Sequence, residues 1–271
     1  MKLGVLIRLN DEVIEEKVKS VRELGFDFCQ ISCWDVSLYT DEMAEKINTA
    51  LEKYNVKVST FWAGWSGPKK WNFTEGPVTL GIVPSDYRYQ RMQELMAGSD
   101  FAKKIGVKQI ATHAGFLPEN PTDPNFMPVV CAVRAIADRC KQNGQYFLFE
   151  TGQETPVALA RVIETSGAEN LGVNFDVANL ILYGKANPID ALDTLGKYVK
   201  DIHAKDGNYP LDSTSLGKET KIGLGRGDFP RLIAKLNELG YDGHITIERE
   251  ISGEQQIADI KDTKVFLESL F

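Results

Sequence analysis

The sequence lacks the features that would direct the protein to nucleic acid or to a membrane. Its 271 residues include 31 lysines and arginines against 38 acidic residues, giving a net charge of −7, and they contain no basic block. The electrostatic footprint of a nucleic-acid-binding protein is therefore missing, and we expect no nucleic-acid partner. No run of about 18 apolar residues is present either, so we expect no membrane span.

Cysteine is scarce, and no secretion signal precedes the first apolar run. The four cysteines form no Cys-x-x-Cys pair and fall in expected strands or helices, which favours buried free thiols. Met1 and Lys2 lead straight into an expected strand, without a signal peptide. Together these absences predict a cytoplasmic protein.

Short β-branched runs alternate with helical patterns along the whole chain. Asp11 is expected to cap the first helix. No linker or low-complexity tract separates the units, and a barrel of this kind typically needs about 250 residues. We therefore predict an α/β fold, a single (β/α)8 TIM-barrel domain spanning residues 1–271. The expected strands are residues 3–7, 26–32, 56–62, 107–112, 145–150, 171–176, 198–203 and 244–248.

Four of these strands end in a residue that can bind a metal ion. The endings are Glu150, Asp176, His203 and Glu248, which lie 26, 27 and 45 residues apart. In a parallel barrel, consecutive strand ends surround one mouth. Glu150 follows a buried apolar run, where a lone carboxylate is costly unless something pairs with it. Three carboxylates and one imidazole suit Mn²⁺, Mg²⁺ or Co²⁺ and are acceptable to Zn²⁺.

A long segment without a helical period, residues 63–85, follows the third expected strand. It contains Trp65, Trp71 and Phe73. Loops of this length in compact domains are usually functional or disordered, and three aromatic residues argue against disorder. We expect the segment to form a wall or lid at the barrel mouth, with Trp65 contacting a substrate. A hydrophobic plug against neighbouring loops is the alternative.

The four strand endings, with His113 one strand earlier, resemble the xylose isomerase-like superfamily of TIM barrels. This superfamily includes sugar isomerases and epimerases, inosose dehydratases and apurinic endonuclease IV. The run from His203 to Asp206, followed by Gly223-x-Gly-x-Gly-Asp228, is typical of its sugar phosphate isomerase/epimerase branch, which includes the ketose 3-epimerases. The resemblance covers nearly the whole chain. It implies one divalent metal ion, preferably Mn²⁺, held by the four strand endings.

The chemistry of sugar isomerisation fits this set. A proton must leave a carbon next to a carbonyl, and a metal ion bound to the carbonyl and hydroxyl oxygens stabilises the developing enediolate. Epimerisation also needs a second carboxylate to return a proton to the opposite face. In the ketose epimerases the residues that match Glu150 and Glu248 are this acid/base pair, so the resemblance assigns these roles to both. The leading hypothesis is a metal-dependent sugar or sugar-phosphate isomerase/epimerase.

Further residues are candidate substrate contacts. Glu154 could bind sugar hydroxyls or be a charge at a helix start. Lys205 could reach a substrate oxygen or phosphate, and Arg226 lies in a glycine-rich loop that could bind an anion. His113 could contact substrate, support the site or be structural. Asn179 stands where several ketose epimerases have a substrate-binding histidine. Asparagine can hydrogen-bond a hydroxyl but cannot take up and release a proton as histidine does, so we expect a substrate different from those of the familiar ketose epimerases.

Three other functions are weighed against the leading one. Endonuclease IV uses a trinuclear zinc cluster, which a chain with three histidines cannot assemble in the known way. A metal-dependent dehydratase of the inosose or keto-acid type shares the proton abstraction but then expels water. A non-enzymatic carbohydrate or metal binder is the third. The expected partner is a sugar, sugar phosphate or cyclitol, and self-association into a homo-oligomer stays open.

Overall fold

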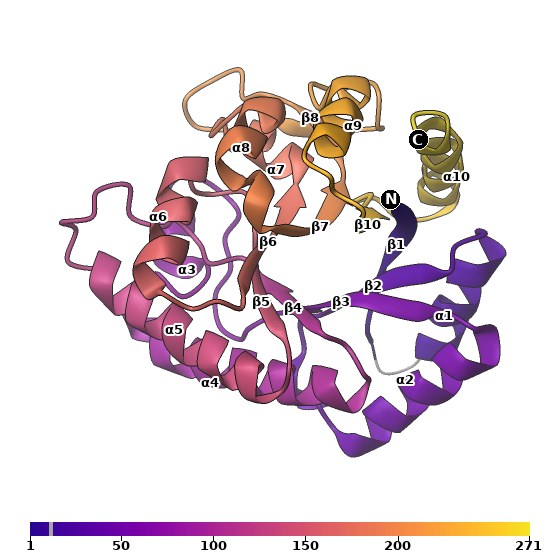
Figure 1. Ribbon diagram of the computed structural model, residues 1–271, viewed down its shortest axis with the longest axis horizontal. Coiled ribbons are helices and arrows are strands. Elements are labelled where there is room, and N and C mark those ends of the chain that lie inside the picture. The colour runs from indigo at the N-terminus through magenta and orange to yellow at the C-terminus, as the bar shows by residue number, and fades with distance from the viewer. Residues whose placement is uncertain (11–12) are drawn as a thin grey trace.

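The computed structural model describes residues 1–10 and 13–271, and within these ranges eight parallel strands close into a barrel surrounded by helices (Figure 1). The predicted TIM barrel is confirmed. Around the ring the strand order is β1-β10-β7-β6-β5-β4-β3-β2, and β1 closes it by pairing with both β2 and β10. The strands are β1 Lys2–Arg8, β2 Phe28–Cys33, β3 Lys57–Ala63, β4 Gln109–Thr112, β5 Tyr146–Glu150, β6 Leu171–Asp176, β7 Val199–Ala204 and β10 His244–Ile247.

Helices of 8 to 20 residues connect successive strands and cover the outside of the barrel. They are α1 Ile14–Glu23, α2 Asp41–Tyr54, α4 Ser85–Lys104, α5 Phe126–Gln142, α6 Pro156–Ser166, α8 Pro188–Leu195, α9 Phe229–Glu238 and α10 Glu254–Glu268. Shorter helical turns lie between them: α3 Gly76–Thr79, α7 Val177–Leu182, η1 Val36–Leu38 and η2 Gly196–Tyr198. No helix among the described residues combines the length and apolar character that a membrane crossing requires.

Side-chain caps begin several of these helices, as the sequence suggests. The hydroxyl of Thr40 accepts a hydrogen bond from the Met43 amide at the start of α2. Asp228 precedes α9, but its backbone is left-handed (φ 44°) and its side chain accepts no capping hydrogen bond. Asp11, the expected cap of the first helix, lies outside the described residues.

The main apolar core lies between the strands and the helices. Phe61 of β3, for example, packs against Phe101 of α4 and Tyr39, with ring centroids 5.4 and 5.7 Å away. The alternate residues of each strand point into the barrel, where a small apolar cluster contains Trp62, Ala111 and Leu148. The same alternation directs the last residues of the strands into the barrel at its mouth.

Below the mouth, the barrel interior is polar. Gln30 of β2 donates to Asn174 of β6 (3.0 Å). Deeper in, the Asp201 carboxylate accepts hydrogen bonds from Thr60 (2.8 Å) and Thr246 (3.3 Å). These groups are buried and satisfied by one another, so they form a defined polar floor under the strand ends.

A two-stranded antiparallel hairpin, β8 Asp206–Asn208 and β9 Lys218–Thr220, extends the loop after β7. The buried Asp206 carboxylate accepts hydrogen bonds from the backbone amides of Gly223, Gly225 and Gly227, at 2.9 to 3.0 Å. A Cβ at Gly225 would lie 2.1 Å from this carboxylate. The glycine-rich loop is therefore wrapped around Asp206, which accounts for its spacing structurally.

Candidate functional site

Four inward-facing side chains converge at the barrel mouth. They are Glu150 at the end of β5, Asp176 at the end of β6, His203 near the end of β7 and Glu248 directly after β10. One ligand atom of each lies within 4.8 Å of those of the other three. His203 Nδ1 lies 3.2 Å from Glu150 Oε1, 3.5 Å from Asp176 Oδ2 and 3.2 Å from Glu248 Oε2. The four residues predicted as ligands thus form one buried cluster.

The imidazole of His203 is held in the orientation that a metal ligand needs. Its Nε2 lies 2.8 Å from Gln30 Oε1 and 3.1 Å from Asn174 Nδ2. The amide oxygen of Gln30 can only accept, so the shorter contact places a proton on Nε2. The neutral imidazole would then have its lone pair on Nδ1. Outer partners of this kind fix the tautomer of metal-binding histidines. Nδ1 faces three carboxylates, an arrangement that a cation between them would stabilise.

Asp176 divides its two oxygens between structure and site. Oδ1 caps α7 by accepting from the Asn179 amide at 2.7 Å. Oδ2 is buried and accepts no hydrogen bond from the described residues. It lies 3.2 Å from Lys205 Nζ and 3.5 Å from His203 Nδ1. A buried carboxylate oxygen that accepts no hydrogen bond from the described part of the chain, beside the Nδ1 atom of an imidazole, fits a hard divalent cation.

Three carboxyl groups and one imidazole are buried together in this cluster, and their pKa values are shifted as a result. Burial lowers the pKa of His203, but Glu150 and Glu248 outweigh burial and raise this pKa well above its usual value. Burial raises the pKa of Glu248, but Lys205 and His203 bring that pKa below its usual value. For Asp176, burial dominates and raises the pKa. In the absence of a cation, protons and Lys205 therefore balance the carboxylates.

A cavity of about 460 Å³ opens at this cluster. Glu150, His203 and Glu248 line it, whereas Asp176 lies behind its wall. Around them the cavity is bordered by a mixture of aromatic, polar and charged residues: Leu6, Arg8, Ser32, Trp34, Trp62, Lys69, Trp71, His113, Gln153, Asn179, Leu182, Tyr183, Leu216 and Glu250. Its volume lies within the usual range for small-molecule sites.

Three tryptophans form one wall of the cavity. Trp34 packs on Trp62 and Trp71, with ring centroids 4.6 and 6.1 Å away, and Trp62 Nε1 donates a hydrogen bond to Glu150 Oε2. Trp65, the expected substrate contact, is fully buried and does not line the cavity. Its ring lies behind Trp34, over the Arg91 guanidinium, which is 4.4 Å from the ring centroid.

Arg91 of α4 explains why the long segment after β3 is ordered. Its buried guanidinium donates to the carbonyls of Pro68, Thr79 and Gly81 at 2.7 to 2.9 Å. This anchoring brings Lys69 and Trp71 to the cavity wall. The sequence interpretation placed the segment at the mouth but selected Trp65 as the substrate contact, because spacing alone does not separate a buried tryptophan from an exposed one.

The other predicted substrate contacts divide into two groups. His113 and Asn179 line the cavity. His113 Nε2 lies 3.5 Å from Glu150 Oε1, and Asn179 Nδ2 donates to the same oxygen at 3.2 Å. Lys205, Glu154 and Arg226 do not line the cavity. Lys205 is buried beneath it, with Nζ 3.1 Å from Glu248 Oε2 and 3.4 Å from Glu250 Oε1.

Glu154 and Arg226 lie away from the cluster in different settings. Glu154 is buried, and burial raises the pKa of its carboxyl to about 8. Arg226 is exposed in the loop around Asp206. Residues of the cavity wall that were not predicted from the sequence include Arg8, Trp34, Trp62 and Glu250. Arg8 is the last residue of β1 and Trp62 the second-last of β3, so both lie at strand ends, but neither is a metal-binding residue type.

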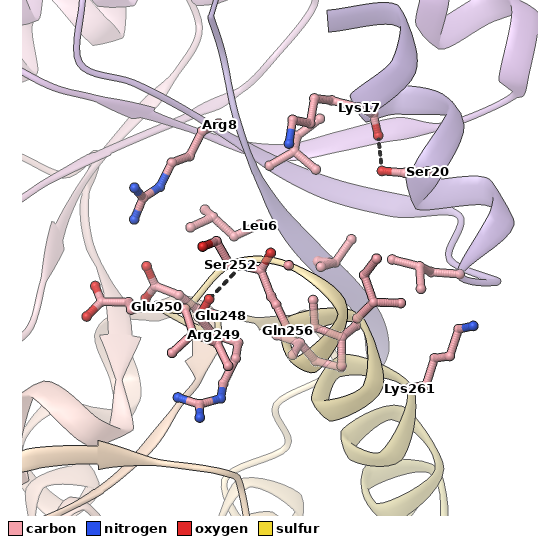
Figure 2. A pocket seen from close by; sticks show the side chains of 18 of the residues that line it. Leu6, Arg8, Lys17, Ser20, Glu248, Arg249, Glu250, Ser252, Gln256 and Lys261 are labelled. Atoms are coloured by element: carbon pink, nitrogen blue, oxygen red, sulfur yellow. Dashed lines mark hydrogen bonds between the residues drawn. The ribbon is translucent and has the colours of Figure 1, made fainter. Parts of the chain in front are cut away.

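A second hollow adjoins the cavity where the barrel closes. This seam groove has a volume of about 910 Å³ and is lined by residues of β1, α1 and α10 and of the segment around Glu248 (Figure 2). Leu6, Arg8, Glu248 and Glu250 line both hollows. The site is therefore continuous with the surface between α1 and α10.

Comparison with known proteins places the chain among xylose isomerase-like TIM barrels, whose family pattern matches residues 18–270. An uncharacterized protein of Methanocaldococcus jannaschii is 33% identical over 266 residues, covering 92% of this chain and 84% of that one. An inosose dehydratase of Lacticaseibacillus casei is 24% identical over 145 residues, covering 48% of each protein.

Solved structures show the same architecture. A xylose isomerase domain protein from Planctomyces limnophilus has a TM-score of 0.93 at 31% identity, covering 99% of this chain and 96% of that one. A 3-keto-D-glucoside 4-epimerase from E. coli has a TM-score of 0.75 at 19% identity, covering 99% of each chain. A xylose isomerase-like TIM barrel protein from Mycobacterium smegmatis, in complex with magnesium, has a TM-score of 0.72 at 18% identity, covering 100% and 98%.

Proposed function

Since the chain belongs to the xylose isomerase-like TIM barrel family, and two glutamates of its ligand cluster line one cavity, we propose that the protein is a divalent-metal-dependent isomerase or epimerase of a sugar or sugar derivative. The observation that carries the proposal is the division within the cluster. Glu150, His203 and Glu248 reach the cavity, whereas Asp176 is turned toward the protein. Two carboxylates are thus available both to a cation and to a bound molecule.

Glu150, Asp176, His203 and Glu248 would hold the cation. When bound, it would supply the positive charge that stabilises negative charge developing on substrate oxygens. The protein's own residues would move the proton: one glutamate removes it from the carbon next to the carbonyl, and the other returns one. Trp62 and Asn179 each donate to Glu150, and Lys205 donates to Glu248, so both carboxylates are fixed in orientation.

The walls of the cavity suit a polyol. Trp34 and Trp71 offer aromatic faces for the C–H side of a sugar ring. On another side, the Gln153 amide and the His113 Nδ1 atom are buried without hydrogen-bond partners among the described residues. Buried polar atoms of this kind cost stability unless a ligand or water satisfies them. Sugar hydroxyls would supply both donors and acceptors to them.

A panel of sugars, sugar phosphates and cyclitols in D₂O, followed by NMR, tests the proposal. An isomerase or epimerase incorporates deuterium at the reacting carbon and forms an isomeric product. Loss of water from the substrate would instead support a dehydratase, the second candidate, which the partial similarity to an inosose dehydratase favours. Metal binding without exchange of any substrate proton would contradict both enzymes and leave a binding protein.

Two variants test the proton transfer itself. Glu150→Gln and Glu248→Gln should each abolish full turnover, because an amide does not exchange protons in this way. With substrate of one configuration, only the variant that keeps the abstracting glutamate should still exchange the proton with D₂O. With substrate of the opposite configuration at the reacting carbon, the other variant should be the one that exchanges the proton with D₂O. Metal content is measured in both, and near-normal turnover in both metal-loaded variants would contradict the two-glutamate mechanism.

A further inference from the structure

An arginine that has no partner among the described residues lies at the junction between the cavity and the seam groove. Arg8 lines both hollows, yet it forms no ion pair or side-chain hydrogen bond within residues 1–10 and 13–271. The acids nearby are already engaged: Glu248 contacts Lys205 and His203, and Glu250 contacts Lys205. Figure 2 shows the Arg8 side chain directed toward the side of the view where Glu248 and Glu250 lie, away from Lys17 and Lys261. Its charge is therefore available to a ligand.

A second cation lies on the same part of the cavity wall. Lys69 Nζ stands 5.0 Å from the ring centroid of Trp34 and donates to the Trp65 carbonyl at 3.2 Å. Trp34 follows β2, and β2 pairs with β1 so that Ser32 lies beside Arg8. Arg8, Trp34 and Lys69 thus line adjoining parts of the mouth, and Lys69 stands over the Trp34 ring.

The strand order places this group across the mouth from much of the ligand cluster. In the ring, β1 is four positions from β5 and three from β6, and β2 is four positions from β6 and three from β5. Glu150 and Asp176 end those two strands. A substrate with its reacting carbon near Glu150 would therefore direct its far end toward Arg8 and Lys69.

The charge balance also favours a negative ligand. Across the cluster and the cavity wall, the described residues provide four carboxylates and three cationic side chains. A divalent cation therefore leaves this site with one net positive charge. The carboxylates are Glu150, Asp176, Glu248 and Glu250, and the cationic residues are Lys205, Arg8 and Lys69.

We propose that Arg8 and Lys69 form an anion subsite that binds a charged substituent at the end of the substrate remote from the reacting carbon. This inference rests on the proposed function and narrows its substrate class to anionic sugar derivatives. Phosphate monoesters and carboxylates share the required chemistry. The first is tetrahedral and the second planar, but each is an oxyanion that accepts two hydrogen bonds from a guanidinium.

Calorimetric titration of inorganic phosphate into protein loaded with Mg²⁺ tests the subsite without any turnover, and comparison of variants separates it from phosphate held at the cation. Wild-type protein should bind phosphate, and Arg8→Gln should weaken binding at least about tenfold, the loss expected for a charge-assisted hydrogen bond. Lys69→Gln should weaken it as well. Lys17→Gln is the matched control, because it removes one positive charge from the outer part of the seam groove and should leave phosphate affinity unchanged. Thermal melts confirm that each variant folds.

Ligand pairs then identify the anion. D-fructose 6-phosphate is compared with D-fructose, and D-glucuronate with D-glucose, in wild-type protein and in Arg8→Gln. The subsite predicts that the charged member of at least one pair binds more tightly and that Arg8→Gln removes this preference. The pair with the larger effect shows whether phosphate or carboxylate is preferred.

The outcomes separate this inference from the proposed function. Equal phosphate affinity in wild type and Arg8→Gln, or an equal loss in Lys17→Gln, would overturn the subsite even if sugars are isomerised. A wild-type protein that binds no phosphate would do the same. Phosphate binding that depends on Arg8, in a protein that exchanges no substrate proton, would support the subsite while the isomerase proposal fails.

Discussion

His203 is the residue on which the cluster depends most, because its Nδ1 lies within 3.5 Å of an oxygen of each of the three carboxylates. We expect His203→Ala to reduce the affinity for a divalent metal ion. The loss should exceed the roughly 10- to 100-fold that typically follows removal of a residue that only hydrogen-bonds a metal ligand. The barrel should remain folded, since the residue lies at the mouth and not between strands and helices. Metal titration and circular dichroism of the metal-free variant measure both effects. A grossly unfolded variant would assign His203 a structural role.

Glu154 should make the unfolding free energy depend on pH. Its pKa is raised by burial from 4.5 to about 8. In the folded protein it therefore keeps a proton that the unfolded chain releases, so stability falls as pH rises through this window, by up to about 1.4 kcal/mol per pH unit. Glu154→Gln should remove the fall and exceed wild type in unfolding free energy above pH 8. Urea unfolding between pH 5 and 9 measures it, with the exposed Glu169→Gln as the control.

At the residue scale, the sequence predicted the cluster of strand-end residues better than the cavity walls. Glu150, Asp176, His203 and Glu248 could be found because a parallel barrel gathers strand ends at one mouth, whatever the intervening loops do. Trp34 and Lys69 could not be assigned in the same way. Their positions depend on Arg91, on ring packing and on strand pairing between residues far apart in the chain.

At the scale of elements, the segment after β3 contains one tryptophan at the cavity and one in the core. Trp71 lines the cavity and is 39% exposed, whereas Trp65 is fully buried. Trp71→Ala should raise KM with little loss of stability. Trp65→Ala should instead destabilise the protein by about 3–5 kcal/mol, the usual cost of truncating a buried aromatic residue. Steady-state kinetics on the substrate found by the panel and denaturant unfolding distinguish them. The reverse pattern would restore the original expectation for Trp65.

The loop after β9 depends on one carboxylate. Asp206→Asn replaces an acceptor of four glycine amides, those of Gly207, Gly223, Gly225 and Gly227, with a group that accepts on one oxygen only, so we expect a loss of about 2–4 kcal/mol. Limited proteolysis should then cut residues 221–228 faster. Asp212→Asn in the exposed turn nearby serves as control, because its amide partners remain open to water. Equal effects of both variants would contradict a special role for Asp206.

The element pattern was largely predictable, and its exceptions share a cause. Alternating strands and helices follow from local periodicity, and the predicted strand boundaries agree with the structure to within a few residues. The β8–β9 hairpin was not predicted. Its strands have three residues each and carry no periodic signal, and they are stabilised by pairing across ten residues and by the contacts of Asp206.

For the whole molecule, metal binding should couple to stability. The ligands come from four strands around the ring, so a cation that binds only the folded barrel stabilises it by mass action. We expect one divalent ion per chain, and a rise in Tm corresponding to about 2.7 kcal/mol at a free metal concentration 100 times Kd. Elemental analysis and thermal melts with and without chelator measure this. Three bound ions per chain, or an unchanged Tm, would contradict the single site.

The closure of the ring through β1 and β10 also sets an order of events during synthesis. A ribosome delivers Glu150, Asp176 and His203 well before Glu248, and until β10 emerges, β1 and β7 each lack a neighbour on one side. Such open edges are where nascent chains associate wrongly. The same final strand covers both edges and brings Glu248 to the other three residues of the cluster. On the proposed function, capture of the cation would thus be tied to the end of translation, and a chain that held it tightly would be one whose barrel had closed.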